Sequence, residues 1–234
     1  MRAFHRFNNG VKVYDDHLIE AQRIRYAKCN VHEQDEEELF LRIIQDLPTG
    51  GVFVSLGSAI GYYALLAKRI RPDLEIHCFE PLDKHRDFLA ENILLNGHSE
   101  HEFSIHSLAV APNSEGYLLV DRAYGSFLIK PENAGSRPTC STDTVCLSGI
   151  SSIIGSAAAD LVQMDIQGLE AAILEEFFSE SERPFAIRSF LIGTHGNDIH
   201  MRCRNALLKN DYMVLHDEAN TANQPDGILA AASR

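Results

Sequence analysis

The stretch Val52–Glu80 reads VFVSLGSAIG, YYALLAKRIRP and DLEIHCFE, and its pattern decides the fold. An apolar run is followed by a turn of small residues, by an amphipathic segment and by a second apolar run that ends in a carboxylate. This order predicts strand, loop, helix and strand, which is the opening of a nucleotide-type binding fold. The small residues of the turn allow a ligand to lie against the backbone, where larger side chains would collide with it.

The glycines of this turn distinguish two classes of ligand. A dinucleotide site requires G-x-G-x-x-G before a helix that holds the pyrophosphate, but this turn has Gly57 and Gly61 with Ala59 between them. S-adenosylmethionine carries no phosphate and requires a tight turn with an acid for its ribose hydroxyls, so the turn favours this methyl donor. A structural turn without a ligand is the alternative.

Glu80 ends the second apolar run, and Pro81 prevents the chain from continuing as a paired strand. A carboxylate at the carboxyl end of a parallel strand can accept both hydrogen bonds of a ribose diol, and ligands bind at that edge. We therefore expect Glu80 to bind a ribose. The alternative is an exposed acid that merely ends a strand.

Strand and helix patterns alternate along the rest of the chain, which predicts one α/β domain with a mostly parallel sheet and helices on both faces. Residues 112–157 are typical of hairpins and loops. We place the domain at residues 35–234 and expect residues 1–34, which lack a strong periodic pattern, to form an N-terminal cap. The expected strands are 52–56, 74–79, 103–110, 161–166, 187–194, 212–216 and 226–232. One expected helix begins near residue 35, and four others cover 61–70, 83–95, 168–178 and 198–209.

Composition excludes several functional classes. The formal net charge of −12 argues against a nucleic-acid substrate, because phosphate contacts need clustered Lys and Arg. No stretch approaches the length of a membrane span, and the N-terminus has no apolar signal segment. The five cysteines are scattered and odd in number, which indicates neither a disulfide framework nor a zinc site. We expect a cytoplasmic protein with no membrane partner.

Four segments together resemble the FkbM-type methyltransferases, which are class I, S-adenosylmethionine-dependent enzymes that typically O-methylate sugars or natural products. The segments are VFVSLGSAIGYYALLAKR, IHCFEPLDKHRDFLAENILLNG, ADLVQMDIQGLEAAILE and FLIGTHG, and a weaker similarity follows at residues 224–229. The resemblance covers roughly Pro48 to His195. It implies a Rossmann-like class I methyltransferase fold: a seven-stranded, mostly parallel sheet with the last strand antiparallel. It also implies S-adenosylmethionine as the cofactor and S-adenosylhomocysteine as its product.

Carried over by position, the resemblance places the methionine and ribose at the turn that follows the first strand, the adenine beside Leu82 and the acceptor at the Gly125-Ser126 turn. The cofactor-binding residues that we expect are Ser55, Gly57, Ser58, Gly61, Glu80, Pro81, Leu82, Ser107, Leu108, Ala109 and Asp165.

The chain departs from the family pattern at four positions. The family usually has an acid at Ser55, a Lys at Gln163 and a Glu at both Gln167 and Gly193, whereas Asp165 and His195 match it. The departures suggest an altered acceptor pocket, a weakened enzyme or a non-catalytic relative.

Asp165 and His195 are the expected catalytic residues, because each ends a predicted parallel strand at the same edge of the sheet. An imidazole with a pKa near 6.5 can take the proton of a hydroxyl as the methyl group arrives, so His195 is the candidate base. Asp165 is its partner or the anchor of the cofactor. A helix N-cap and a structural histidine are the alternatives for these two residues.

The expected substrate-binding residues are Tyr14, Tyr26, Tyr124, Ser126 and His195, since the cap crowds polar and aromatic groups that can cover a small molecule. A divalent cation among Asp165, His195, Glu170 and Asp226 is an alternative, but we assign no metal ligand.

The leading hypothesis is therefore a methyltransferase that moves the methyl group to a hydroxyl of a small-molecule acceptor, such as a sugar or natural product, as a monomer or an oligomer. The main alternative is a methyltransferase fold that has lost catalysis and serves as a binding or scaffold protein. An NAD-dependent oxidoreductase is disfavoured by the two-glycine turn.

Overall fold

A seven-stranded sheet forms the centre of the protein. The computed structural model describes residues 2–113, 116–122, 124–221 and 226–234. The strands are β3 (Val52–Leu56), β4 (Glu75–Phe79), β5 (Ser104–His106), β12 (Leu161–Met164), β14 (Ser189–Thr194), β15 (Tyr212–Glu218) and β16 (Gly227–Ser233). Their spatial order is β15-β16-β14-β12-β3-β4-β5. The pairs from β14 to β5 are parallel, and β16 is antiparallel to both neighbours. The predicted sheet, including the antiparallel last strand, is confirmed.

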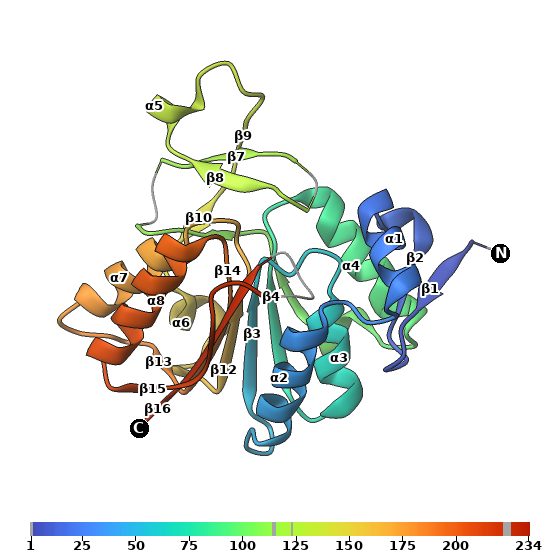
Figure 1. Ribbon diagram of the computed structural model, residues 1–234, viewed down its shortest axis with the longest axis horizontal. Coiled ribbons are helices and arrows are strands. Elements are labelled where there is room, and N and C mark those ends of the chain that lie inside the picture. Colours follow the sequence, from blue (N-terminus) through green and yellow to red (C-terminus); the bar gives the residue numbers. More distant parts are fainter. Residues whose placement is uncertain (1, 114–115, 123, 222–225) are drawn as a thin grey trace.

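Helices cover both faces of the sheet, as predicted (Figure 1). One face carries α2 (Gln34–Gln45), α3 (Tyr62–Ile70) and α4 (Asp83–Leu95), and the other carries α6 (Ile150–Ile154), α7 (Glu170–Ser179) and α8 (Asn197–Lys209). Two apolar cores result, one on each face. Central parallel strands need cover on both faces, which is why β3 is an unbroken apolar run apart from Ser55.

The expected strand 103–110 is wrong as a single element. The chain leaves the sheet after His106, and β6 (Ala109–Val110) pairs instead with β10 (Thr144–Val145). The apolar pattern continues through both pieces, so it does not reveal the change of partner. The hairpins expected in 112–157 are present: β7 (Leu118–Val120), β8 (Phe127–Ile129) and β9 (Cys140–Ser141) form an antiparallel sheet with α5 (Pro131–Ala134) beside it. We call residues 116–145 the insertion; it lies above the carboxyl edge of the main sheet (Figure 1).

The N-terminal segment is more regular than its sequence predicts. It contains a hairpin of β1 (Phe4–Arg6) and β2 (Lys12–Tyr14), a 3-10 turn η1 (Asp15–His17) and the helix α1 (Glu20–Lys28). The sequence of α1, EAQRIRYAK, is largely polar, and its few apolar residues give no clear buried stripe. A second 3-10 turn is η2 (Glu100–Glu102), and the short strands β11 (Ala158–Ala159) and β13 (Ala186–Ile187) pair with each other.

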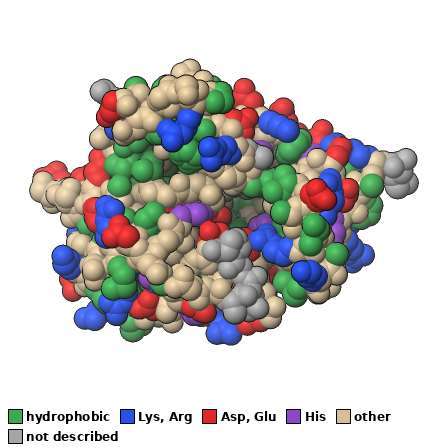
Figure 2. Space-filling view, turned by 45° about the horizontal axis from the view of Figure 1, so that its top comes forward, with side chains coloured by type: hydrophobic (Ala, Val, Ile, Leu, Met, Phe, Trp, Pro, Cys, Tyr) green, Lys and Arg blue, Asp and Glu red, His purple; other side chains and the backbone are tan. Residues whose placement is uncertain are grey.

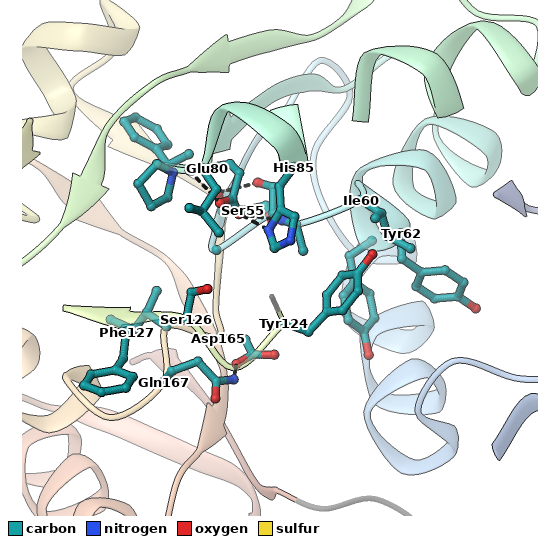
Figure 3. Close-up of a pocket in the computed structure, with 18 of the residues that line it drawn as sticks. Ser55, Ile60, Tyr62, Glu80, His85, Tyr124, Ser126, Phe127, Asp165 and Gln167 are labelled. Atoms are coloured by element: carbon teal, nitrogen blue, oxygen red, sulfur yellow. Dashed lines mark hydrogen bonds and ion pairs between the residues drawn. The ribbon is translucent and has the colours of Figure 1, made fainter. Parts of the chain in front are cut away.

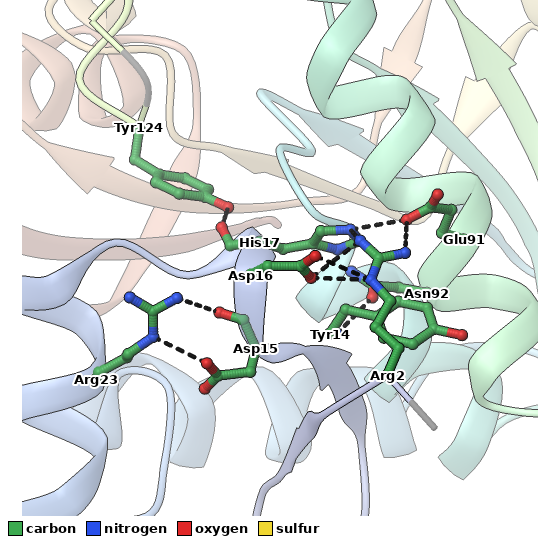
Figure 4. A network of polar contacts seen from close by, with 9 residues as sticks. All are labelled: Arg2, Tyr14, Asp15, Asp16, His17, Arg23, Glu91, Asn92 and Tyr124. Carbon is green, nitrogen blue, oxygen red and sulfur yellow. Dashed lines mark hydrogen bonds and ion pairs between the residues drawn. The ribbon is translucent and has the colours of Figure 1, made fainter.

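Polar side chains of α4 hold the N-terminal segment in place. The amide of Asn92 accepts the backbone N–H of Tyr14, and Asn96 bonds both the N–H and the carbonyl of Lys12. Arg2 adds ion pairs to Asp16 and Glu91 (Figure 4). Buried apolar residues of the segment join the core of α2 and α3. The domain boundary at residue 34 stays a prediction.

In the described ranges, no helix is both long and apolar enough to cross a bilayer. All five cysteines are free thiols.

Candidate ligand-binding site

A cavity of about 390 Å³ opens at the carboxyl edge of the main sheet, beneath the insertion. The surface is hollowed there, and acidic side chains and a histidine are visible at the hollow (Figure 2). This volume is typical of small-molecule sites. The predicted residues that line it are Ser55, Gly57, Ser58, Glu80, Pro81, Leu82, Leu108, Ala109, Tyr124, Ser126 and Asp165.

Close packing of the backbone explains the two glycines of the turn. Gly57 has a φ of +78°, and a Cβ there would lie 2.0 Å from the carbonyl oxygen of Asp165 on the neighbouring strand end. Gly61 has a φ of +83°, and its Cβ would lie 2.1 Å from Cδ1 of Leu89. Gly57 also lines the cavity. Gly61 packs against α4 and is not among the described lining residues. The turn needs both glycines for structural reasons.

Glu80 is buried, with 4% of its surface exposed, and two backbone groups hold its carboxylate. Oε2 accepts the N–H of Ala59 at 2.8 Å, and Oε1 accepts the N–H of Leu82 at 3.0 Å. Nδ1 of His85 lies 3.5 Å from Oε1 (Figure 3). The fixed carboxylate retains lone pairs that face the cavity, so it can accept further hydrogen bonds from a ligand diol.

The cavity is apolar beyond Glu80. Leu82, Leu108, Ala109 and Val110 line this end with Phe79, which stacks on His106. A flat, uncharged ring is the group that suits such a slot. Ser107 is not among the described lining residues, so the adenine pocket that the sequence predicts is contacted by Leu108 and Ala109 without it.

A buried chain of hydrogen bonds connects β3 and β12 to α2. Ser55 Oγ donates to Oε1 of Gln163, whose Nε2 donates to Oε1 of Glu36 at 3.3 Å. A Cβ on Gly193 would lie 3.7 Å from both Asp165 and Oε2 of Glu36. Three of the four positions at which the sequence departs from the resembled pattern, Ser55, Gln163 and Gly193, therefore lie near one carboxylate, that of Glu36 in α2.

Asp165 and His195 meet at the sheet edge, as predicted, together with two further carboxylates. Nδ1 of His195 donates to Oε1 of the fully buried Glu170 at 2.8 Å. Its Nε2 lies 3.5 Å from Oδ1 of Asp165 and 3.4 Å from Oδ1 of Asp226. Glu170 also accepts the backbone N–H of Gly168, which fixes its position.

The acids around His195 determine its charge. Burial opposes the charged imidazole, but the hydrogen bond to Glu170 and the charges of Asp165 and Asp226 outweigh it and raise the pKa of His195 to about 9. The ring is therefore an imidazolium at neutral pH, which does not accept a proton. It is also not among the described lining residues. Both observations disfavour His195 as the base.

The pKa of Asp165 is raised to about 6, mainly by burial. Its carboxylate lines the cavity beside Gln167, whose Nε2 donates to Oδ1 at 3.1 Å (Figure 3). Asp165 is thus ionised at pH 7, and it has the higher proton affinity of a buried carboxylate. Asp165 therefore both reaches the cavity and can take up a proton.

Residues before α2 complete this end of the cavity. Glu33 is buried, and burial together with the charge of Asp165 raises its pKa to about 7. Arg25 Nη2 lies 3.5 Å from Oε1 of Glu33. His32 stacks on Tyr62, and burial lowers its pKa to about 3, so its ring is neutral.

Of the predicted substrate residues, Tyr124 and Ser126 line the cavity, and Tyr14 and Tyr26 are not among the described lining residues. Tyr26 is buried, and its hydroxyl bonds Nδ1 of His32 at 2.6 Å. Tyr14 packs against the guanidinium of Arg2. Tyr26 thus contacts a lining residue, His32, without lining the cavity itself.

Tyr124 connects the insertion to the N-terminal segment. Its hydroxyl donates to the carbonyl of His17 at 2.5 Å, and its ring stacks on His85 at 5.0 Å between centroids (Figure 4). Because Nδ1 of His85 lies 3.5 Å from Glu80, this contact places Tyr124 on the side of the cavity where Glu80 lies.

The sequence prediction missed several lining residues, namely Glu33, Tyr62, Tyr63, His85 and Phe127. Tyr62 and Tyr63 follow the glycine turn directly, and this position could have revealed them. Glu33 had no such signal. Within the part of the chain that the structure describes, no three His, Cys, Asp or Glu residues gather to hold a metal ion. Gln224 and Pro225 of the family-like segment lie outside the described residues.

No protein-family model matches the sequence, and no curated protein matches it. In structure, the chain is similar to the precorrin-6y C5,15-methyltransferase of Geobacter metallireducens GS-15, with 12% identity, a TM-score of 0.52, and coverage of 94% of this chain and 96% of that one. It is also similar to M. jannaschii TYW2 in complex with AdoMet, with 15% identity, a TM-score of 0.50, and coverage of 99% and 84%. Together with the strand order, this likeness shows that the chain has the Rossmann-like fold of the class I methyltransferases.

Proposed function

We propose that the protein is an S-adenosylmethionine-dependent methyltransferase that acts on a hydroxyl of a small molecule. The observation that carries the proposal is the carboxylate of Glu80, which two backbone N–H groups hold at the wall of the cavity beside the glycine turn. A carboxylate so fixed suits the two hydroxyls of a ribose. The solved complex of TYW2 with AdoMet on the same fold is consistent with this ligand.

The residues of the cavity fit the three parts of S-adenosylmethionine. The apolar slot of Leu82, Leu108 and Ala109 would take the adenine, and Glu80 the ribose. Arg25, whose Nε has no hydrogen-bond partner among the described residues, would pair with the methionine carboxylate. Glycines at Gly57 and Gly61 alone do not provide the pyrophosphate cradle of a dinucleotide site, which disfavours NAD.

The chain's own contribution to the chemistry is alignment and the removal of one proton. S-adenosylmethionine, when bound, supplies an activated methyl group on a sulfonium. Asp165 would take up the proton of the acceptor hydroxyl as the methyl group passes to its oxygen, and the electron pair of the broken carbon–sulfur bond would remain on sulfur. His195 acts as a positioning residue, because its imidazolium holds Asp165, Glu170 and Asp226 together. This assignment replaces the prediction that His195 is the base.

The second candidate is a methyltransferase fold without catalysis that serves as a binding or scaffold protein. The neutral pair of Ser55 and Gln163 favours it, because the family pattern has charged groups at these positions. Such a protein would bind S-adenosylhomocysteine and transfer no methyl group to any acceptor. Transfer of radioactive methyl from S-adenosylmethionine to a panel of hydroxylated metabolites separates the two candidates.

Isothermal titration of the folded protein with S-adenosylhomocysteine tests the proposal, with NADH as the control ligand. We expect one site per chain for the homocysteine compound and no heat of binding with NADH. No binding of S-adenosylhomocysteine would remove both candidates. A cytoplasmic location, indicated by the free thiols, is part of the same proposal.

A further inference from the structure

Three carboxylates from distant parts of the chain line one end of the cavity, which we call the acidic end. Glu33 precedes α2, Asp165 follows β12 and Asp226 precedes β16. Arg25 is the one Arg or Lys among the described lining residues. The formal negative charge that faces the cavity at this end therefore exceeds the fixed positive charge.

The imidazolium of His195 does not remove this excess. It is not among the described lining residues, and it is shared among Asp165, Asp226 and the fully buried Glu170, which accepts its closest contact at 2.8 Å. The pKa values of the cavity-lining acids remain raised, to about 7 for Glu33 and about 6 for Asp165, with burial as the first cause. The pKa of Asp226 is raised too, for the same reason. Burial thus disfavours the charge of each carboxylate, which lacks a full counter-charge: at neutral pH Asp165 is mostly ionised and Glu33 only partly so.

An unpartnered hydroxyl lies in the same wall. Tyr63 lines the cavity with 7% of its surface exposed, and its hydroxyl has no hydrogen-bond partner in the described ranges. The charges of Glu36 and Glu33 act on this hydroxyl, and with burial they raise its pKa. A buried hydroxyl without a partner costs free energy, which a polar ligand group in the cavity would recover.

The chemistry of the acidic end points to an organic cation. Metal ions need three or more converging ligands, and the described His, Cys, Asp and Glu residues form no such group. The rings of Tyr62 and Tyr124 line the cavity and can contact the methylene groups of an alkylammonium. S-adenosylmethionine does not neutralise the acidic end alone. Its sulfonium, ammonium and carboxylate leave it with a single net positive charge, whereas Glu33, Asp165 and Asp226 exceed the charge of Arg25 by more than one.

We infer that the acceptor carries a protonated amine beside its reacting hydroxyl, and that Asp226 and Glu33 bind this ammonium while Tyr63 contacts it through its hydroxyl. The inference rests on the proposed function and names the substrate class of that same cavity: amino sugars, amino alcohols and similar cationic small molecules. Asp165 stays free to take the hydroxyl proton. The excess negative charge would also discriminate against anionic acceptors.

Bisubstrate analogues test the inference without knowledge of the acceptor. In one analogue of S-adenosylhomocysteine, the sulfur is replaced by a nitrogen that carries a 3-aminopropyl group, and in its match the same nitrogen carries a butyl group. Both reach the acceptor side of the cavity, and they differ in one ammonium. Their dissociation constants are measured by isothermal titration in EDTA, with S-adenosylhomocysteine as the reference ligand.

We expect the aminopropyl analogue to bind at least about tenfold more tightly than the butyl analogue, because one hydrogen bond between charged groups contributes about that factor. The ratio of the two dissociation constants should fall toward one in the variants Asp226→Asn and Glu33→Gln. It should persist in the control variant Asp198→Asn, since Asp198 is an exposed acid on α8. A ratio of one or less in the wild-type protein, while S-adenosylhomocysteine binds, overturns the inference and leaves the proposed function intact. Failure of S-adenosylhomocysteine to bind overturns both.

Discussion

Replacement of Glu80 by Gln isolates the role of its carboxylate. The two oxygens of Glu80 accept the N–H groups of Ala59 and Leu82, whereas a glutamine side chain has one oxygen and one NH₂ group. One of these partly buried N–H groups therefore loses its acceptor, which costs about 1–2 kcal/mol of unfolding free energy. For a chain of 234 residues, this corresponds to a fall of about 2–8 °C in Tm. The variant should remain folded at 20 °C.

The effect on ligand binding should be larger than the effect on stability. Loss of a charged hydrogen bond to the ribose diol costs about 1.5–3 kcal/mol, which corresponds to roughly 10- to 150-fold in Kd. Isothermal titration is carried out with S-adenosylhomocysteine and with its 2′,3′-dideoxy analogue. Glu80→Gln should weaken binding of the first compound and hardly change that of the second. Glu75→Gln, at the other end of the same strand and exposed, is the matched control.

The reasoning is refuted if Glu80→Gln binds S-adenosylhomocysteine as tightly as the wild-type protein does. It is also refuted if the variant weakens the dideoxy analogue by the same factor, since the loss would then come from the distorted turn and not from the hydroxyls.

Three other perturbations test the packing and the charge of the site. Gly57→Ala places a Cβ 2.0 Å from a backbone carbonyl oxygen and should lower the unfolding free energy in urea by more than about 3 kcal/mol. The control Gly50→Ala, also at positive φ but with open space around it, should lower it by about 1 kcal/mol. Equal losses would contradict the close approach at Gly57. His195 has a folded pKa of about 9, above its unfolded value of 6.5, so its stabilisation is complete below pH 6.5 and is lost as the pH rises through 9. Between pH 7 and 10 the wild-type protein should therefore lose on the order of 3 kcal/mol more unfolding free energy than His195→Gln does, and parallel pH curves would show that the imidazole is neutral. Tyr124→Phe removes a hydrogen bond to the N-terminal segment worth about 1 kcal/mol, and limited proteolysis should cleave the insertion faster in this variant, while unchanged cleavage would contradict its role in connecting the insertion to the N-terminal segment.

The sequence predicted the elements around the first turn almost to the residue. The strand Val52–Leu56 and the helix Asp83–Leu95 have the predicted bounds, because an unbroken apolar run and the Asn96-Gly97 cap mark their limits locally. Gly97 has the positive φ that such a cap requires. Glu80 was found by the same local logic, since a strand end followed by proline fixes the position of its carboxylate.

The acidic end could not be predicted in the same way. Glu33 and Asp226 are separated by most of the chain, and no local pattern distinguishes them from surface acids. Their approach to Asp165 depends on how the residues before α2 pack over the sheet edge. The charge of His195 was missed for a related reason: its pKa depends on three carboxylates, all of which come from other elements.

The position of S-adenosylhomocysteine in a crystal structure of the complex tests the central claim most directly. The account predicts both ribose hydroxyls within about 3 Å of the Glu80 carboxylate, as hydrogen-bond geometry requires, the adenine between Leu82 and Leu108, and the sulfur facing Asp165. A ligand bound outside this cavity, or one whose ribose does not contact Glu80, would contradict it.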